Sequence, residues 1–361
     1  MEVYNFCAGP AMLPRAVMRR IHDEFLDYHG IGASIIEVSH KSPMFRDVLD
    51  NAIELFRELS GLPDDYYVLF VHGGARMQFS AVPLNIIARS ATRLSCYVET
   101  GLFAQQARAE GTRYGTTTVV ASSADTGFDR IPVVPPYSCP ADAAYLHITS
   151  NNTVYGTRWN DFPTGFALPL VVDATSDILS RRLDHSQLGI TYAGFQKNLG
   201  PSSLALVVIR DDLLGHALPE TPLLLNYQVY AESQSLYNTP NMFGIYVMAL
   251  ILEWILEQGG LDAVEAVNNA KADLLYRELD RSGFYRPTAL EDHRSITNVT
   301  FHLRDESLTA KFLEHSAAQG LLALRGHRTV GGVRASIYNG MPMEGVAALV
   351  EFMREFERTQ G

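Results

Sequence analysis

Cysteine is scarce in this sequence of 361 residues, which contains only Cys7, Cys96 and Cys139. Three thiols cannot all pair, and their positions match no metal-binding spacing, so we expect neither a disulfide framework nor a metal site. The HExxH and GxSxG motifs are also absent, and the eleven histidines are scattered. The sequence therefore disfavours zinc-dependent and serine-based hydrolysis, and its cysteine content suits a reducing cytoplasm.

Apolar runs long enough to cross a membrane are missing as well. The longest, MFGIYVMALILEWIL over residues 242–256, is interrupted by Glu253 and falls short of the roughly 20 residues that a span needs. We interpret it as a buried helix and expect no membrane partner. The opening stretch, MEVYNFCAGPAMLPRAVM, lacks the basic and apolar regions of a signal peptide, so we expect a cytoplasmic protein.

Basic residues are outnumbered by acidic ones, 29 to 40, so the formal net charge is −11. This balance argues against a nucleic-acid partner held through its phosphates. One segment departs from it: residues 315–343 contain no acidic side chain, yet they include Arg325, His327, Arg328 and Arg334. Taken alone, the segment is more typical of a surface patch paired with distant carboxylates, and an anion-binding pocket is the alternative.

Helical and strand patterns alternate through roughly the first 250 residues, which predicts an α/β domain with a mostly parallel sheet covered by helices. The clearest predicted elements are strands over 66–72, 167–174 and 204–209 and a helix over 75–88.

The pair Gly259 and Gly260 breaks this alternation, and the pattern beyond it predicts a smaller α+β domain. Its expected elements are a helix over 261–279, the strand ITNVTFHL, a helix over 307–319, the strand VRASIY and a final helix. We therefore divide the chain into an N-terminal arm (1–15), a large domain (16–258) and a small C-terminal domain (259–361).

Lys197 lies between two apolar runs, GITYAGF and LALVVI, which are typical of buried strands. Its nearest acidic residues in the sequence, Asp184 and Asp211, are 13 and 14 residues away. A buried amine without a carboxylate is costly, unless it is neutral, paired from far away in the sequence, or chemically modified.

Two further features could complete a cofactor site with Lys197. The run HGGARMQF (72–79) places two glycines between a strand and a helix, where free N–H groups can bind phosphate, although a plain tight turn fits equally well. Asp173 ends a predicted strand, where it is either a ligand-binding carboxylate or a turn residue. A phosphate cradle, a carboxylate for a ring nitrogen and an amine for an aldehyde together describe a pyridoxal phosphate site.

Several motifs then match one family in order along the chain. They are EVSHKSPMF (37–45), HGGARMQF, YAGFQKNLGP (192–201), YNTP (237–240) and GHRTVGGVRASIYN (326–339). The chain resembles the phosphoserine aminotransferases, which are fold-type I pyridoxal phosphate enzymes of serine biosynthesis. The resemblance implies a seven-stranded, mostly parallel sheet and a homodimer with shared active sites. It also implies amino transfer between glutamate and 3-phosphooxypyruvate, giving 2-oxoglutarate and phosphoserine, and the same reaction on the 3-hydroxy-4-phosphooxy analogue in pyridoxal phosphate synthesis.

The resemblance also implies roles in cofactor binding. Lys197 is expected to form the Schiff base and then to move the α-proton of the substrate, while Asp173 holds the ring nitrogen. Phe103 stands where the family commonly stacks a tryptophan on the ring. The other expected cofactor contacts are the backbone of Ala75 and Arg76, the side chains of Thr153 and Gln196, and, reaching the phosphate from the other subunit, Asn238 and Thr239.

A second implied group binds the substrate. Arg334 matches the residue that grips the α-carboxylate, and His327 with Arg328 matches the pair that binds the substrate phosphate. His40 and Lys41 are expected near the distal anion of the substrate, but the family commonly has arginine in place of Lys41. With this resemblance, the acid-free segment is expected to form an anion pocket.

Two other classes of protein are weighed against this one. A lyase that forms a Schiff base without a cofactor would also need a buried lysine, but it would leave Asp173 and the two glycines of HGGARMQF without a role. A non-catalytic protein that binds phosphorylated anions could use the acid-free segment alone and would not need Lys197.

Overall fold

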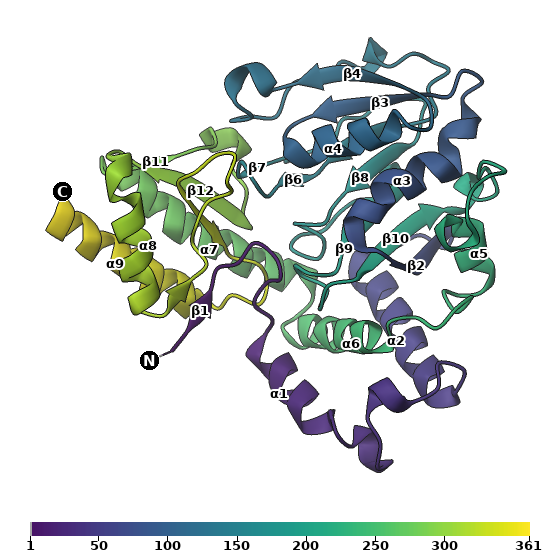
Figure 1. Ribbon diagram of the computed structural model, residues 1–361, viewed down its shortest axis with the longest axis horizontal. Coiled ribbons are helices and arrows are strands. Elements are labelled where there is room, and N and C mark those ends of the chain that lie inside the picture. Colours follow the sequence, from purple (N-terminus) through teal and green to yellow (C-terminus); the bar gives the residue numbers. More distant parts are fainter. Residues whose placement is uncertain (1) are drawn as a thin grey trace.

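The computed structural model describes residues 2–361, and Figure 1 shows a large and a small unit joined side by side. The helices are α1 (Arg15–Glu24), α2 (Pro43–Ser60), α3 (Gly74–Ile86), α4 (Leu102–Gly111), α5 (Tyr227–Glu232), α6 (Met242–Glu257), α7 (Leu261–Arg281), α8 (Thr309–Ala318) and α9 (Met343–Gln360). The strands are β1 (Tyr4–Asn5), β2 (Tyr66–His72), β3 (Leu94–Glu99), β4 (Thr116–Ser122), β5 (Leu146–Thr149), β6 (Asn151–Asn152), β7 (Thr157–Arg158), β8 (Leu170–Asp173), β9 (Ile190–Gly194), β10 (Leu204–Arg210), β11 (Tyr285–Pro287), β12 (Asn298–Leu303), β13 (Leu321–Leu322) and β14 (Val333–Ser336).

The large unit is built on a seven-stranded sheet with the strand order β2-β10-β9-β8-β5-β3-β4 within the described chain. Strand β10 is antiparallel to both of its neighbours, and the other pairs are parallel. Alternate residues of β10 enter different cores: Leu206 packs with α2 and α6 on one face, and Val207 packs with α3 on the other. Burial on both faces explains why this strand reads as a continuous apolar run.

One edge of this sheet gathers the ends of several strands. Thr149 at the end of β5 is in register with Asp173 at the end of β8, and His72 at the end of β2 is in register with Leu204, where β10 begins. Neighbouring parallel strands end at this edge, and the loops that follow them lie together beyond it. Open α/β sheets bind their ligands at such an edge.

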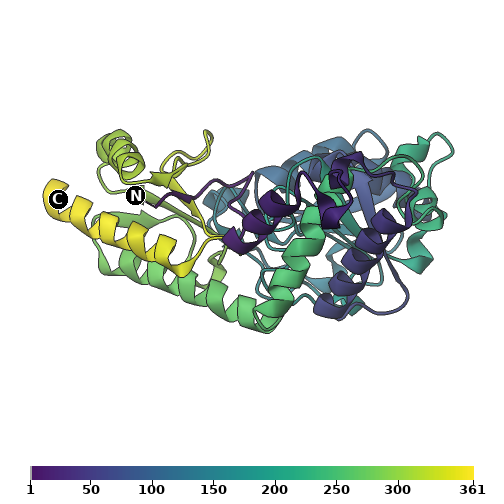
Figure 2. The same cartoon turned by 90° about the horizontal axis from the view of Figure 1, so that it is seen from below.

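The small unit has its own apolar core beneath the antiparallel sheet β11-β12-β14, with α7, α8 and α9 around it. Tyr4 and Phe6 belong to this core, and β1 pairs with β13. The start of the N-terminal arm is therefore packed into the small unit. Figure 2 shows α6 leading into α7 through a sharp bend, which measures 86°. The two cores separate near this bend, and the exact domain limits stay a prediction.

The predicted elements agree with the structure where the apolar period is strong, as in β2, β10, α6 and α7. Two predicted elements are too long. The strand predicted over 167–174 is shortened to Leu170–Asp173, directly after Pro169, which has no N–H to donate to a neighbouring strand. The helix predicted over 307–319 begins at Thr309, because Glu306–Leu308 forms a 3₁₀ turn capped by Asp305.

The apolar segment over 242–256 is the buried helix α6. In residues 2–361 no single helix is long and apolar enough to cross a membrane, although the bent pair of α6 and α7 passes that test together.

Candidate active site

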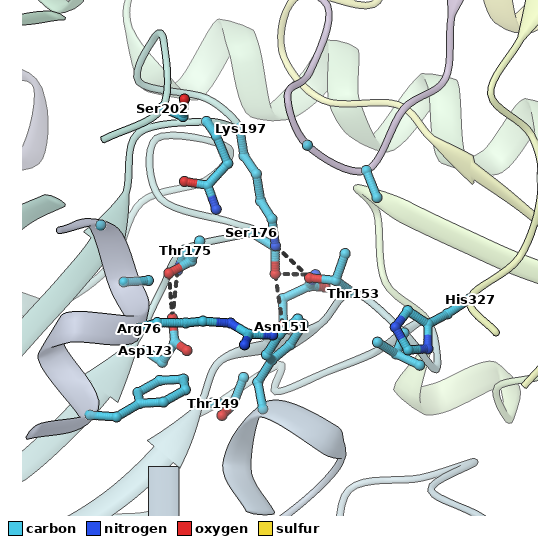
Figure 3. Close-up of a pocket in the computed structure, with 18 of the residues that line it drawn as sticks. Arg76, Thr149, Asn151, Thr153, Asp173, Thr175, Ser176, Lys197, Ser202 and His327 are labelled. Atoms are coloured by element: carbon cyan, nitrogen blue, oxygen red, sulfur yellow. Dashed lines mark hydrogen bonds between the residues drawn. The ribbon is translucent and has the colours of Figure 1, made fainter. Parts of the chain in front are cut away.

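A cavity of about 410 Å³ opens at the carboxyl edge of the large sheet, where the two units meet (Figure 3). Residues from several separate parts of the chain line it: the N-terminal arm, the start of α3, the start of α4, the ends of the central strands, the turn that contains Lys197, and β14 with the loop before it. The predicted site residues among them are Ala75, Arg76, Phe103, Thr153, Asp173, Gln196, Lys197, His327 and Arg334. Tertiary structure thus brings most of the predicted site into one cavity.

Lys197 is 6% exposed, and its amine projects into this cavity. The amine donates a hydrogen bond of 2.6 Å to the hydroxyl of Thr153, and within residues 2–361 it forms no ion pair with a carboxylate. Burial lowers the pKa of Lys197 to about 8, with Arg334 acting in the same direction and Asp173 opposing it. Near physiological pH the neutral, nucleophilic form of this amine is therefore a minority, but it is far more populated than in an ordinary lysine with a pKa of 10.5.

Asp173 is 5% exposed and lies at the end of β8 (Figure 3). Its Oδ1 accepts hydrogen bonds from the backbone N–H and the hydroxyl of Thr175, at 3.0 and 2.6 Å. Burial raises the pKa of this carboxyl, while the Thr175 hydrogen bonds and the Lys197 charge oppose the rise. One oxygen of Asp173 thus stabilises the turn, and the carboxylate also lines the cavity. The sequence offered a turn residue and a ligand-binding carboxylate as alternatives, and the structure is compatible with both.

The glycine pair of HGGARMQF forms the start of α3. Gly73 has a φ of 89°, and no side chain caps the helix, whose first residues include Ala75 and Arg76. The N–H of Gly73 is bonded to the carbonyl of Ser203, and the next residues, Gly74, Ala75 and Arg76, line the cavity. An uncapped helix start of this kind favours an anion through its free N–H groups and its dipole.

An aromatic face and a cationic group lie on other walls of the cavity. The ring centroid of Phe103 is 5.8 Å from the amine of Lys197. Arg334, on β14, donates to the carbonyl of Thr153 at 3.4 Å and forms no ion pair within the described chain. Burial lowers the pKa of this arginine, and it also lowers the pKa of His327, which has Arg334 and Arg328 nearby. An arginine without a carboxylate partner in a cavity is suited to bind an anion.

Five of the predicted site residues do not line this cavity. Arg328 is exposed on the loop between β13 and β14, beyond His327. The other four form a separate group: Thr239 Oγ1 lies 3.4 Å from His40 Nδ1, Asn238 contacts His72 at 3.3 Å, and Lys41 follows His40. Two motifs about 200 residues apart in the sequence therefore meet outside the cavity of their own chain.

Some cavity residues were not identified from the sequence. Ala8 and Gly9 come from the N-terminal arm, where Ala11 donates to the carbonyl of Gln196 at 2.8 Å. The motif NFCAGP was visible, but nothing local indicated that the arm crosses the turn of Lys197. Thr175 and Ser176 follow Asp173 in a turn-like stretch and Asn151 begins a glycosylation sequon, and neither pattern indicates that these three residues line the cavity.

Comparison with known proteins identifies the family of this chain. Residues 3–349 match the family described as aminotransferase class-V. The phosphoserine aminotransferase of Desulfosudis oleivorans is 49% identical over 362 residues, covering 100% of this chain and 99% of that protein. The chain belongs to the phosphoserine aminotransferase family. This assignment confirms the family predicted from the motifs.

Solved structures of family members agree with this assignment. Phosphoserine aminotransferase from Bacillus circulans subsp. alkalophilus is 43% identical, with a TM-score of 0.96, covering 100% of this chain and 99% of that one. The PLP-bound enzyme from Trichomonas vaginalis is 34% identical, with a TM-score of 0.92, covering 98% and 100%. The fold-type I architecture is thereby confirmed, and the chain is a pyridoxal phosphate-dependent aminotransferase. The cofactor-free lyase and the non-catalytic binding protein are set aside.

The cavity fits the cofactor on physical grounds. Pyridoxal phosphate carries an aldehyde, a basic ring nitrogen and a phosphate. The amine of Lys197, the carboxylate of Asp173 and the uncapped start of α3 are complementary to these three groups and line one cavity.

Proposed function

We propose that this enzyme transfers an amino group between glutamate and 3-phosphooxypyruvate, giving 2-oxoglutarate and phosphoserine. The observation that carries the proposal is one cavity that combines Lys197 and Asp173 with Arg334 and His327. It is supported by 49% identity over the whole chain to a phosphoserine aminotransferase. The first two residues suit the chemistry of the cofactor, and the second two suit an anionic substrate.

Bound pyridoxal phosphate supplies the carbonyl with which amines condense and the electron-withdrawing ring that weakens the α-C–H bond. In the proposal Lys197 Nζ would hold the cofactor through its aldehyde and, when free, would act as the base that takes the α-proton of the substrate. Burial lowers the pKa of this amine to about 8, which is suitable for both tasks. Thr153, at 2.6 Å, orients the amine before the substrate arrives.

Asp173 has the proposed role of accepting a hydrogen bond from the protonated ring nitrogen. Phe103 packs its ring against the cofactor, with less area than the tryptophan common in the family. Ala75 and Arg76 bind the phosphate through their backbone N–H groups, at the uncapped start of α3. The side chain of Gln196, next to Lys197 in the same turn, is proposed to contact the cofactor as well.

The substrate enters between Arg334 and the cofactor in this proposal. A planar guanidinium without an acidic partner is suited to hold the α-carboxylate in a two-pronged contact. His327 meets the substrate phosphate from inside the cavity, and Arg328 meets it from the rim. The segment over 315–343 contains no acidic residue that would compete for these cations.

We further propose that a second copy of the chain completes each site. Asn238 and Thr239 lie beside His72 and His40, outside the cavity of their own chain. The contact between His40 and Thr239 places Lys41 in the same group, so all four residues can reach a neighbouring cavity together. In this arrangement Asn238 and Thr239 bind the cofactor phosphate, while His40 and Lys41 bind the distal anion of the substrate.

Two parts of the proposal extend beyond this reaction. The 3-hydroxy-4-phosphooxy analogue has the same two anions at the ends of a longer chain, so the same arginines and histidine can bind it. A cytoplasmic location is expected from the three cysteines, which are free thiols in the described chain.

A half-reaction tests the proposed function. The purified enzyme carrying pyridoxal phosphate is mixed with phosphoserine in the absence of any oxo acid. The absorbance of the aldehyde form of the cofactor should be replaced by that of the amine form, with one equivalent of 3-phosphooxypyruvate released per site. Serine, which lacks the phosphate, should convert the cofactor far more slowly. Equal rates with serine and phosphoserine would contradict the proposed substrate.

A further inference from the structure

Asp173 and Thr175 are joined by two hydrogen bonds that use only one carboxylate oxygen. Oδ1 of Asp173 accepts from the backbone N–H of Thr175 at 3.0 Å and from its hydroxyl at 2.6 Å (Figure 3). Among the described residues no donor is bonded to Oδ2, although Asp173 lines the cavity. The carboxylate therefore has one oxygen bound by the protein and one available to a ligand.

The hydroxyl of Thr175 is itself held in place by the neighbouring strand. The backbone N–H of Gly194, at the end of β9, donates to Thr175 Oγ1 at 3.2 Å. Because this N–H approaches the oxygen as a donor, the hydrogen of the hydroxyl is directed to Asp173. The hydrogen bonds thus run in one direction, from Gly194 through Thr175 to Asp173.

Gly194 in turn is fixed by contacts with the phosphate end of the cavity. A Cβ on Gly194 would lie 2.6 Å from the side-chain oxygen of Gln196 and 3.2 Å from the backbone nitrogen of Ala75. A side chain there would be crowded by Ala75 and would displace Gln196, so the glycine lets β9 pack closely against the start of α3. The strand end that anchors Thr175 therefore also touches the residues proposed to hold the cofactor phosphate.

We infer that Thr175 is a positioning residue that fixes the orientation and the negative charge of Asp173, so that Oδ2 faces the ring nitrogen of the cofactor. The inference rests on the proposed role of Asp173. Without the hydroxyl donor, Oδ1 of the carboxylate would keep only the backbone N–H of Thr175, so rotation about its χ2 angle would be less restrained. Its ionised form would also lose a charge-assisted hydrogen bond. In this inference Thr175, which also lines the cavity, acts through its hydrogen bonds to Asp173.

The hydroxyl also opposes the other influences on Asp173. Burial and the nearby carboxylate of Asp177 both favour the protonated form of Asp173, whereas the two Thr175 hydrogen bonds and the charge of Lys197 favour the ionised form. Removing one of the two hydrogen bonds shifts the balance toward the protonated carboxyl. A protonated carboxyl has no negative charge with which to stabilise a protonated ring nitrogen.

Three variants of the loaded enzyme test the inference. Thr175→Val removes the hydroxyl at nearly constant volume, and Thr175→Ser retains it. Thr191→Val is the matched control, because Thr191 is buried in β9 and its hydroxyl has no partner within the described residues. The measurements are kcat and KM for glutamate from pH 5 to 9, and the dissociation constant of the cofactor by equilibrium dialysis.

For Thr175→Val we expect kcat to fall about tenfold with KM within about twofold, and the acidic limb of the kcat profile to move up by about one pH unit. Cofactor binding should weaken by about tenfold. Thr175→Ser should stay within about threefold of wild type with its acidic limb unmoved, and Thr191→Val should match wild type. If Thr175→Val does not fold, Thr175→Ala removes the same hydroxyl and carries the same expectation.

Asp173→Asn separates the two ways in which the idea can fail. If Asp173→Asn loses most activity while Thr175→Val keeps a wild-type kcat and pH profile, the inference about Thr175 is wrong and the proposed role of Asp173 stands. If Asp173→Asn itself is fully active, the proposed role of Asp173 is wrong and the inference falls with it. A uniform loss in Thr175→Val that Thr175→Ser does not restore would overturn the inference as well.

Discussion

The amine of Lys197 donates to the hydroxyl of Thr153 at 2.6 Å, and the same amine forms no ion pair with a carboxylate anywhere in residues 2–361. A buried amine held by one neutral hydroxyl is poorly stabilised as an ammonium ion. The proposed function explains this placement by chemistry rather than by stability, because the amine would form a covalent bond to the cofactor.

Lys197→Ala should abolish turnover, with a loss of more than about a thousandfold in kcat. The folded protein should persist, because the substitution also removes a group whose burial is costly. Activity is measured with glutamate and 3-phosphooxypyruvate, and folding by circular dichroism and thermal unfolding. Substantial remaining transamination in a folded variant would show that another group does the chemistry.

The reactivity of the cofactor-free protein should depend on pH through Lys197. Only the neutral amine attacks an aldehyde, and the neutral fraction rises as pH increases through the pKa. Burial lowers that pKa to about 8 from the ordinary 10.5, so the rate of pyridoxal phosphate capture should be half-maximal near pH 8. Stopped-flow absorbance from pH 6 to 10.5 measures it. A rate that still rises steeply above pH 9.5 would contradict the lowered pKa.

Arg328→Ala should lower kcat/KM for phosphoserine by about 1–2 kcal/mol, roughly five- to thirtyfold. The expected effect is moderate because Arg328 is exposed and does not line the cavity. Arg325→Ala, another exposed arginine of the same acid-free segment, is the control and should change little. Serine should react almost equally with all three proteins. A similar loss for serine in Arg328→Ala would indicate a folding defect.

Lys41→Arg should raise kcat/KM for glutamate by about 1–2 kcal/mol, with a smaller change for phosphoserine. Arginine offers a rigid fork to a carboxylate, whereas Lys41 is exposed and offers one mobile charge. In the proposed function glutamate would depend more on this position, because the phosphate of the other substrate would also meet His327 and Arg328. Both half-reactions are measured for each protein. No gain would mean that lysine reaches equally well, and a better donor than glutamate for wild type would mean that Lys41 marks a different specificity.

Lys271→Met should lower the free energy of unfolding by about 3 kcal/mol. Lys271 is fully buried on α7, and its amine donates to the carbonyls of Ile337, Tyr338 and Met341 at 3.1, 2.8 and 2.9 Å. The substitution removes a donor from three buried carbonyls, of which only that of Tyr338 keeps another donor within the described chain, the N–H of Met341 at 2.9 Å. Lys311→Met, at an exposed lysine on α8, is the control and should stay within about 0.5 kcal/mol. Equal stability of the two variants in denaturant would refute the structural role of Lys271.

The sequence by itself determined the elements and the central chemistry of this protein. Strands such as β10 and helices such as α6 are defined by side chains a few residues apart, so their periodicity is legible in the sequence. Lys197 between two apolar runs and Asp173 at a strand end were also local signals. The motifs then predicted the family, the fold and the cofactor, and all three are confirmed.

Only the tertiary structure decided which distant segments meet. The pairing of β1 with β13 places Tyr4 and Phe6 in the core of the small unit, and the contact of Thr239 with His40 groups two motifs outside their own cavity. The hydrogen bonds from Gly194 through Thr175 to Asp173 depend on the register of β8 and β9. Such contacts arise from the packing of whole layers, and no periodicity within one segment encodes them, because the partners are selected by burial and hydrogen bonding across the fold.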